Sequence, residues 1–316
     1  MTSPRHRVVV PVHIPEFTGY YAQLASVLEL CLDSIFFTQV EGQRLTVIAN
    51  ECAPEVVTAL TNRLEDGKID QLVVYGKNRG KVDALLAILP RCQEDIVTLS
   101  DGDVLLRAGW QAAVERVFQA FPECGWVAPV TALLPRYHTT STLAAAGLGG
   151  ELTYRGAVSR ADLLEFAQSV DDPGRFSEEQ LRRQLIVARD DRRALVGGGH
   201  FVASLRREAA AVLPTTPTGI AVSGGSEAAG LDRPIDAAGF WRLSTTRSYA
   251  LHMGNVIEPR FATEFEELKA NPLRGGTGER PSLPAVDKHW SSSLPMRARS
   301  LLARGTYRRL VRSETS

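Results

Sequence analysis

The first 130 residues alternate between two hydrophobic periods, and this alternation constrains the fold more than any other feature of the sequence. Five short runs rich in Val and Ile are nearly continuous in apolar character, as strands buried on both faces are. Between them, apolar residues recur at helical spacing, as from Leu24 to Ile35 and from Trp110 to Phe121. Strands alternating with helices predict a mostly parallel sheet covered on both faces. The predicted strands are 7–12, 44–49, 71–75, 95–100 and 125–130, and the remaining helical stripes are 54–60 and 82–89.

Polar side chains follow the predicted strands at the points where the strands end. In open α/β sheets, ligands bind beyond the carboxyl ends of the strands, which meet at one edge. We therefore expect four loops to converge on a single site at that edge. The residues that follow the first four strands are His13, Asn50, Glu51, the segment 78–81, Asp101 and Asp103.

The tripeptide Asp101-Gly102-Asp103 follows the fourth predicted strand directly. Magnesium and manganese prefer oxygen ligands, and Mg²⁺ commonly takes one or two carboxylates together with substrate phosphates. Gly102 lets the backbone come close to a phosphate. The alternative is a plain Asp-Gly turn, which is common. The position of the tripeptide after a buried strand, in line with the other polar loops, favours the metal site.

The second half of the chain is less regular. Segments 160–170 and 177–195 have helical patterns, and Ser177 with the acids that follow it forms a good capping arrangement. Segment 197–213 predicts a glycine loop, a short strand and a helix. Segment 271–295 is rich in Pro, Gly and Ser and predicts a linker. The last segment, 296–312, is rich in arginine and contains no acid, and no internal repeat is present.

Composition narrows the class of protein. Lys+Arg and Asp+Glu are equal at 36 each, which argues against a nucleic-acid partner. No apolar run approaches the roughly 20 residues of a membrane-spanning helix, and Pro11 and Pro15 interrupt any signal-peptide core. The four cysteines are widely spaced without a C-x-x-C pair, so a disulfide framework or zinc site is not expected. The expected compartment is the cytoplasm.

Four segments together resemble family 2 glycosyltransferases of the GT-A fold. They read "VVVPVHIPE", "VIANEC", "KNRGKVDALL" and "LSDGDVLLRAGW", and their order and spacing carry the resemblance over residues 7–130, more loosely to about 255. It implies a nucleotide-diphospho-sugar transferase fold, with a mostly parallel sheet flanked by helices and a C-terminal extension. It further implies a nucleotide-sugar-binding half at 1–130, an acceptor-binding half of the same domain at 131–258, and a linker with a basic extension at 259–316.

The resemblance also implies a donor site. Pro11, Val12 and His13 would lie beside the nucleoside. Asn50 stands where the family often has an Asp that binds the base, a departure that leaves the identity of the base open. A divalent ion, Mn²⁺ or Mg²⁺, would be held by Asp101 and Asp103, with His252 in "YALHMGNV" as a further ligand; a histidine in a strand is otherwise often structural. The remaining donor-binding residues implied are Asn78, Gly80, Lys81 and Gly102.

The acceptor site should come from "GGSEAAGLDRPIDAAGF", residues 224–240. The family places a pair of acids there, and in this chain Glu227 matches the first while Ala228 replaces the second, often the base. Glu227 is therefore the candidate base, with Asp232 and Asp236 as alternates; the other interpretation is a solvated helix face. His200 is a weaker candidate for an acceptor or donor contact. Trp241 is expected in the core.

These residues together imply a metal-dependent, inverting, hexosyltransferase-like enzyme. It would move a sugar from a nucleoside diphosphate sugar to a hydroxyl- or amine-bearing acceptor. A nucleotidyltransferase is one alternative, although "PVHIPEFTGYY" lacks the Gly-rich basic loop of that class. A non-catalytic nucleotide-sugar-binding module is another, because of Ala228. The arginine-rich tail allows a solvated helix, a packing arm, or peripheral contact with anionic lipid.

Overall fold

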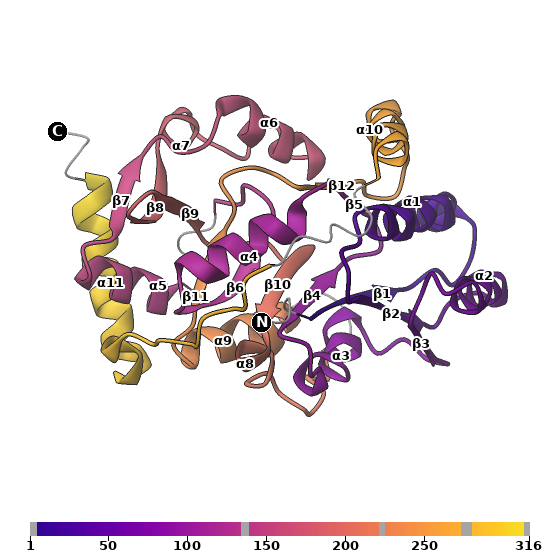
Figure 1. The fold of residues 1–316 in the computed structure, drawn as a ribbon, viewed down its shortest axis with the longest axis horizontal. Helices are drawn as coiled ribbons and strands as arrows, with labels where there is room; N and C mark the ends of the chain where they lie inside the picture. The colour runs from indigo at the N-terminus through magenta and orange to yellow at the C-terminus, as the bar shows by residue number, and fades with distance from the viewer. Residues whose placement is uncertain (1–4, 134–138, 221–224, 273–279, 313–316) are drawn as a thin grey trace.

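The computed structural model describes residues 5–133, 139–220, 225–272 and 280–312. Its centre is a ten-stranded sheet in the order β3-β2-β1-β4-β10-β6-β11-β9-β8-β7 (Figure 1). The first four strands in this order pair parallel to one another. They lie within one or two residues of the predicted positions, so the predicted parallel sheet is confirmed here. Their bounds are β1 (His6–Val12), β2 (Gln43–Asn50), β3 (Gln71–Tyr75) and β4 (Ile96–Ser100).

The other six strands extend the sheet beyond β4. The pairing of β10 with β4 and β6 is antiparallel, that of β6 with β11 is parallel, and β9, β8 and β7 follow as an antiparallel set. The antiparallel strands come from the part of the sequence with the less regular pattern. Their bounds are β6 (Cys124–Ala128), β7 (Leu152–Arg155), β8 (Gln184–Arg189), β9 (Arg192–Val196), β10 (Val202–Arg206) and β11 (Trp241–Ser244).

The helix predicted over 177–195 is wrong beyond its first turn. Ser177 and Gln180 form the capping box, as the sequence indicates, but α7 (Glu178–Arg182) ends after five residues. The chain then forms the hairpin of β8 and β9, which turns at Asp190 with a φ of 52°. The hairpin is favoured because its apolar residues complete the sheet beside β11, and tertiary pairing of this kind overrides a local helical pattern.

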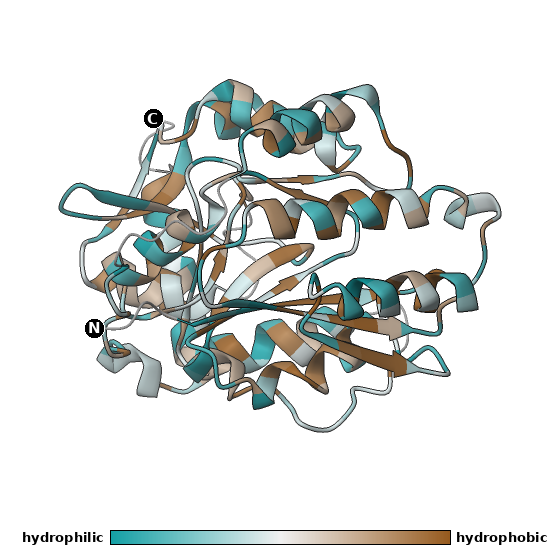
Figure 2. Cartoon of the chain, turned by 45° about the vertical axis from the view of Figure 1, so that its right-hand side comes forward, coloured by the Kyte–Doolittle hydropathy of each residue, from teal (hydrophilic) through white to brown (hydrophobic). Residues whose placement is uncertain are grey.

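Helices cover both faces of the sheet (Figure 2). Val8 and Val10 of β1 face a core shared with α1 (Leu24–Phe37) and α4 (Trp110–Ala120), whereas Val9 faces a second core shared with α3 (Lys81–Leu86). Alternate residues of one strand thus fill two cores, which explains the continuous apolar runs. The other helices are η1 (Gly19–Tyr21), α2 (Pro54–Glu65), η2 (Leu89–Arg91), α5 (Thr140–Leu148), α6 (Arg160–Ser169), α8 (Arg207–Ala210), η3 (Ala228–Asp232), α9 (Arg233–Ala237), α10 (Pro259–Ala270), η4 (Trp290–Ser293) and α11 (Met296–Arg312).

The arginine-rich C-terminal segment is a packing arm. Helix α11 lies against α5 (Figure 1), and Gly147 leaves room for Thr306, since a Cβ at that glycine would lie 2.4 Å from the Thr306 methyl. Arg299 is buried and donates to the carbonyls of Asp236 and Ala237, each at 2.8 Å. The predicted linker 271–295 falls partly on residues 273–279, outside the described residues.

A second, small sheet pairs β5 (Val104–Leu106) with β12 (Ala250–His252) in antiparallel register. This pairing places His252 opposite Val104, which is 148 residues earlier in the chain and close to the end of β4. Trp241 is buried, as expected for a core residue, and the four cysteines are free thiols. Within the described ranges, every helix is too short or too polar to cross a bilayer.

Candidate active site

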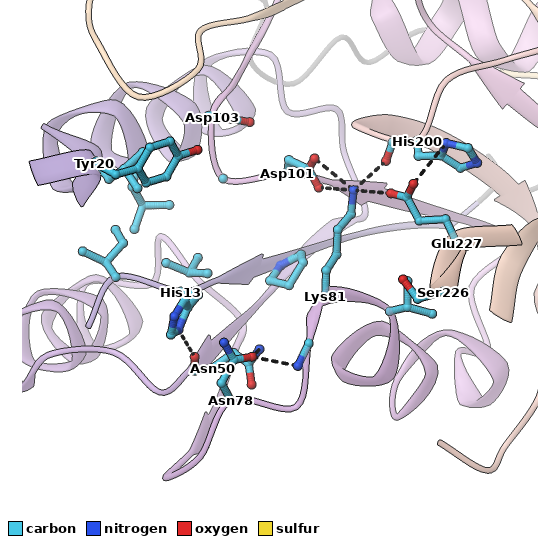
Figure 3. Close-up of a pocket in the computed structure, with 18 of the residues that line it drawn as sticks. His13, Tyr20, Asn50, Asn78, Lys81, Asp101, Asp103, His200, Ser226 and Glu227 are labelled. Carbon is cyan, nitrogen blue, oxygen red and sulfur yellow. Dashed lines mark hydrogen bonds and ion pairs between the residues drawn. The ribbon is translucent and has the colours of Figure 1, made fainter. Parts of the chain in front are cut away.

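A cavity of about 710 Å³ lies at the carboxyl ends of β1, β2 and β4 (Figure 3). Its wall includes every residue predicted for the donor site except His252, which contacts the lining residue Asp103. Of the predicted acceptor-site acids, the wall includes Glu227 and Asp232 but not Asp236. The expected convergence of the polar loops on one edge therefore occurs. The predicted residues in its wall are Pro11, Val12, His13, Asn50, Asn78, Gly80, Lys81, Asp101, Gly102, Asp103, His200, Glu227 and Asp232.

The Asp101-Gly102-Asp103 loop is held from both sides by backbone hydrogen bonds. The N–H of Asp101 donates to the carbonyl of Phe201 at 2.7 Å, and the carbonyl of Asp103 accepts from the N–H of Met253 at 2.8 Å. Gly102 passes close to both α1 and β1, since a Cβ there would lie 3.3 Å from Leu28 Cδ1 and 3.7 Å from Val12 Cγ2. The loop is thus fixed between β10 and β12, which place His200 and His252 on either side of it.

Asp103 and His252 form a pair. The Nε2 atom of His252 lies 3.3 Å from Oδ2 of Asp103, and Oδ1 of Asp103 is buried without a hydrogen-bond partner. Burial raises the pKa of Asp103 to about 6, against the opposing effect of His252. A buried carboxylate oxygen without a partner is costly unless a cation or donor meets it. Asp103 therefore has the properties of an incomplete cation site.

The structure does not assemble Asp101, Asp103 and His252 into a group of three ligands. No set of three or more His, Cys, Asp or Glu side chains able to hold a metal is found in the described part of the chain. Asp101 is instead paired with Lys81. Asp103 nevertheless fits as the single carboxylate that Mg²⁺ can take together with substrate phosphates. The His252 imidazole, 3.3 Å from Asp103, is the other candidate ligand at this position.

Lys81 lies at the centre of the cavity wall (Figure 3). Its Nζ is 2.7 Å from Oδ1 of Asp101 and 3.1 Å from Oε1 of Glu227, and it donates to the carbonyl of His200 at 3.2 Å. Burial alone would lower the pKa of Lys81, but the charges of Asp101 and Glu227 outweigh it and raise the pKa above its ordinary value. The side chain therefore presents a permanent ammonium group to the cavity.

Asp232 is not available as a base in this conformation. Its side chain is fully buried, it accepts from His200 Nε2 at 2.8 Å, and it forms an ion pair with Arg242. Burial raises the pKa of Asp232, yet the hydrogen bond from His200 and the charge of Arg242 lower it below its ordinary value overall. The alternate Asp236 lies elsewhere, where it accepts from Thr140 and from the N–H of Ser141. Of the three acids, Glu227 alone has a side chain exposed to the cavity.

Asn50 and Asn78 organise the opposite end of the cavity. The Nδ2 of Asn50 donates to Oδ1 of Asn78 at 2.9 Å, and Oδ1 of Asn50 accepts from the N–H of Arg79 at 2.9 Å. Oδ1 of Asn78 also accepts from the N–H of Gly80, whose φ of 77° is a conformation that favours glycine. His13 is fixed by a 2.8 Å contact between its Nδ1 and the carbonyl of Asn50. The amide of Asn50 therefore serves to hold the loop that carries Lys81.

Several lining residues were not predicted from the sequence. Tyr20 and Tyr21 extend over the cavity, and the Tyr21 ring packs edge-on to His13 with the ring centroids 5.8 Å apart. Ser226 lies next to Glu227. Arg242 lies outside the cavity wall and holds Asp232 from the core. The sequence does not indicate this role, because Arg242 follows Trp241 inside a buried strand. Of these residues, Tyr20 and Tyr21 could have been predicted from the sequence as part of the site. They are two adjacent aromatic residues after β1, and aromatic side chains combine a large apolar surface with a polar end that suits a binding site.

Comparisons with known proteins found similar solved structures at low sequence identity. No protein-family model and no curated protein matches the chain. A mannosyltransferase from Pyrobaculum calidifontis, solved with GDP-Man and Mn²⁺, aligns over 96% of this chain and 74% of its own at 16% identity and a TM-score of 0.45. TarS from S. aureus, solved with UDP, aligns over 96% and 71% at 9% identity and a TM-score of 0.46.

A third similar structure is a CMP:2-keto-3-deoxy-manno-octonic acid synthetase with CTP, which aligns over 85% of this chain and all of its own. Its identity is 15% and its TM-score is 0.44. Because the TM-scores lie below 0.5, the matches carry no argument about substrate, metal or reaction. The functional argument therefore depends on the cavity itself.

Proposed function

We propose that this protein is a glycosyltransferase that uses a nucleoside diphosphate sugar as donor. The observation that carries the proposal is the position of the Lys81 ammonium between Asp101 and Glu227. The same cavity is also lined by the amides of Asn50 and Asn78. A fixed cation between a donor end and an acceptor end suits the departure of a charged diphosphate, which needs electrostatic stabilisation in a site with little water.

The features of the donor end of the cavity suit the binding of a nucleoside. His13 and Asn50 are fixed by the hydrogen bonds described above, and Tyr20 and Tyr21 offer aromatic faces. Pro11, Val12 and Gly102 give this end a close-packed floor, since a Cβ at Gly102 would lie 3.7 Å from Val12 Cγ2 and 3.8 Å from the Pro11 carbonyl oxygen. In the proposal the nucleoside binds here, with its diphosphate directed toward Lys81.

The metal belongs to the proposal as well. Mn²⁺ or Mg²⁺ would be held by Asp103 and His252, with Asp101 as a further ligand once a diphosphate engages Lys81. When bound, the ion would supply Lewis-acid stabilisation of the diphosphate. In this chain Lys81 would orient the diphosphate. The Oδ1 atom of Asp103, which has no hydrogen-bond partner, would itself be the oxygen ligand offered to the ion.

The acceptor end is formed by Glu227. Its side chain is 38% exposed and faces the cavity from the segment before η3. It would accept the proton of the acceptor hydroxyl or amine as the bond to the anomeric carbon forms, a role for which position is the first requirement. Attack by the acceptor on the face of the anomeric carbon opposite the leaving diphosphate would invert the anomeric configuration. A product with retained configuration would contradict Glu227 as the base.

The test is release of nucleoside diphosphate from UDP-glucose, GDP-mannose, ADP-glucose and dTDP-glucose, with and without pooled sugar acceptors. Acceptor-dependent release from one donor, together with a glycosylated product, would support the transferase. Formation of pyrophosphate from a nucleoside triphosphate and a sugar phosphate would favour a nucleotidyltransferase instead. Tight donor binding without release over all acceptors would favour a binding module.

The exposed face of α11 adds a proposed contact with an anionic lipid surface. Arg297, Leu301, Arg304 and Arg308 are exposed and share one helical stripe, and Leu301 is 69% exposed. Such a stripe suits a peripheral, electrostatic contact. Sedimentation with phosphatidylglycerol vesicles should exceed sedimentation with phosphatidylcholine vesicles and should decline with salt. Equal sedimentation with both would contradict this contact.

A further inference from the structure

A continuous series of contacts leads from the core of the protein to the candidate base. Arg242 pairs with Asp232, and Asp232 accepts from Nε2 of His200 at 2.8 Å. The Nδ1 of His200 lies 3.5 Å from Oε2 of Glu227, whose other oxygen faces Lys81. Figure 3 shows the His200 ring directed at Glu227. The series ends at the cavity, where Glu227 is within reach of the His200 ring.

The buried end of this series is rigid. Arg242 is 3% exposed, and its guanidinium lies 4.3 Å from the centre of the Trp126 ring. Asp232 is enclosed by this guanidinium and by His200, which together keep its carboxylate ionised. The ionised carboxylate can only accept hydrogen bonds. Asp232 therefore fixes both the orientation and the tautomer of the imidazole.

The fixed tautomer leaves one nitrogen free for chemistry. Since Nε2 of His200 donates to Asp232, the neutral ring carries its lone pair on Nδ1, which faces Glu227. A carboxylate that orients an imidazole in this way is a recurring device in enzymes that move protons. The other group near the ring is the Lys81 ammonium, which contacts the carbonyl of His200 and not the imidazole. The edge of the Trp126 ring closes the remaining side, with the centroids 6.0 Å apart.

Glu227 needs such a partner. Its Oε1 pairs with Lys81, and Ala228 offers no second carboxylate where the resemblance places one. If the acceptor proton stayed on Glu227, the ion pair with Lys81 would lose its negative partner during the reaction. Transfer of that proton to His200 keeps Glu227 ionised, and the resulting imidazolium lies between two carboxylates.

We propose that His200 is a positioning residue and proton relay, which receives on Nδ1 the proton that Glu227 takes from the acceptor. This inference rests on the proposed transferase function. The acceptor O–H bond breaks and its electron pair forms the bond to the anomeric carbon, while the bond from that carbon to the diphosphate oxygen breaks. The proton moves to Oε2 of Glu227 and then to Nδ1 of His200, so that the negative charges of Glu227 and Asp232 both persist.

The first measurement is a pH profile of nucleoside diphosphate release, with water as the acceptor, from whichever of the four nucleotide sugars is hydrolysed. His200→Gln should lower kcat about 10- to 100-fold, leave the donor KM within about twofold, and remove the acidic limb of the profile. Asp232→Asn should change the same limb, because the amide no longer fixes the tautomer. His289→Gln, in a histidine remote from the cavity, is the matched control and should match the unmodified protein.

The second measurement needs no substrate. In ¹⁵N-labelled protein, long-range ¹H–¹⁵N spectra should give the Nε2–H tautomer for the neutral form of the His200 ring, with the signal assigned from the His200→Gln variant. An Nδ1–H tautomer would overturn the relay whatever the activity. If the protein is active and His200→Gln keeps both kcat and the pH profile, the relay is wrong and the transferase stands. If no donor is bound or hydrolysed, the transferase function fails and the relay fails with it.

Discussion

The Nζ atom of Lys81 lies 3.1 Å from Oε1 of Glu227, although 146 residues separate the two in the sequence. Lys81 is the first residue of α3, and Glu227 precedes the π-helical turn η3. Their contact joins the half of the chain with the donor loops to the half with the acceptor segment. Because the ammonium also pairs with Asp101, removal of any of the three groups should disturb the same cavity.

Replacement of Lys81 tests the central cation. Lys81→Met leaves Asp101 and Glu227 facing each other without a counter-charge, and it removes the donor proposed to bind the diphosphate. Hydrogen bonds to charged groups contribute about 1.5–3 kcal/mol, so nucleoside diphosphate affinity should fall roughly 10- to 100-fold. Titration calorimetry measures this fall. Lys68→Met removes an exposed lysine of the same kind and should leave the affinity unchanged; equal affinity in both variants would contradict the role of Lys81.

Replacement of Asp103 tests the metal ligand. Asp103→Asn keeps the shape of the side chain but removes the charge that faces His252, so stabilisation by Mn²⁺ in the presence of nucleoside diphosphate should disappear. The variant should remain folded, because an uncharged amide is easier to bury than the carboxylate. Thermal unfolding with and without Mn²⁺ measures the effect. Asp191→Asn, on an exposed turn, is the control, and an unchanged Mn²⁺ response in Asp103→Asn would exclude this site.

His6 makes the stability of the protein depend on pH. Burial, with a smaller effect from Arg280, lowers the pKa of His6 to about 3. The unfolded chain has a histidine pKa of about 6.5, so below that pH the unfolded state binds a proton that the folded state does not. The free energy of unfolding should therefore fall as the pH falls from about 6.5 toward 3, by at most about 1.4 kcal/mol per pH unit from this residue.

The variant His6→Gln isolates that contribution from those of the acids. The Nε2 of His6 contacts Thr98 at 2.6 Å, a polar contact that a glutamine amide can replace. Urea unfolding of both proteins at several pH values should give a shallower decline in the variant between pH 6 and pH 4.5. Parallel curves would contradict a lowered pKa, because they would mean that His6 takes up its proton over the same pH range in the folded and unfolded protein.

Gly230 sets the approach of η3 to α3. A Cβ at this position would lie 2.5 Å from Val82 Cγ1, a side chain buried in the core beside Lys81. Gly230→Ala should therefore destabilise the fold by about 1–3 kcal/mol through overpacking and should separate Glu227 from Lys81. Gly174→Ala, where a Cβ meets nothing within 4 Å, is the matched control. Equal unfolding midpoints for both variants would show that η3 can shift without cost.

Much of the first half of the fold could be predicted from the sequence, because strands buried on both faces carry continuous apolar runs that are easily distinguished from helical stripes. The predicted convergence of His13, Asn78 and Asp101 followed from the topology of parallel strands, since their carboxyl ends share an edge. The hairpin of β8 and β9 could not be predicted, because its pairing with β11 depends on a strand about 50 residues later.

The contacts within the site were also beyond sequence reasoning. Nothing in the sequence links Asp232 to Arg242 and His200, and the spacing that suggested Asp232 as a base does not reveal that it is fully buried. Likewise, the Asp101-Gly102-Asp103 motif predicts a metal site but not the lysine that pairs with its first carboxylate. Such contacts arise from packing between segments remote in the chain, and only the folded structure specifies them.

The most direct test of the central claim is thermal stability of the protein with UDP, GDP, ADP, CDP and dTDP, each with and without Mn²⁺. A ligand at 100 times its dissociation constant stabilises the folded state by about 2.7 kcal/mol, which is easily measured. A site built from Lys81, Asp103 and the Asn50 loop should respond to one nucleoside diphosphate, and more strongly when Mn²⁺ is present. No response to any nucleotide at millimolar concentration, with or without the metal, would contradict a nucleotide-sugar site in this cavity.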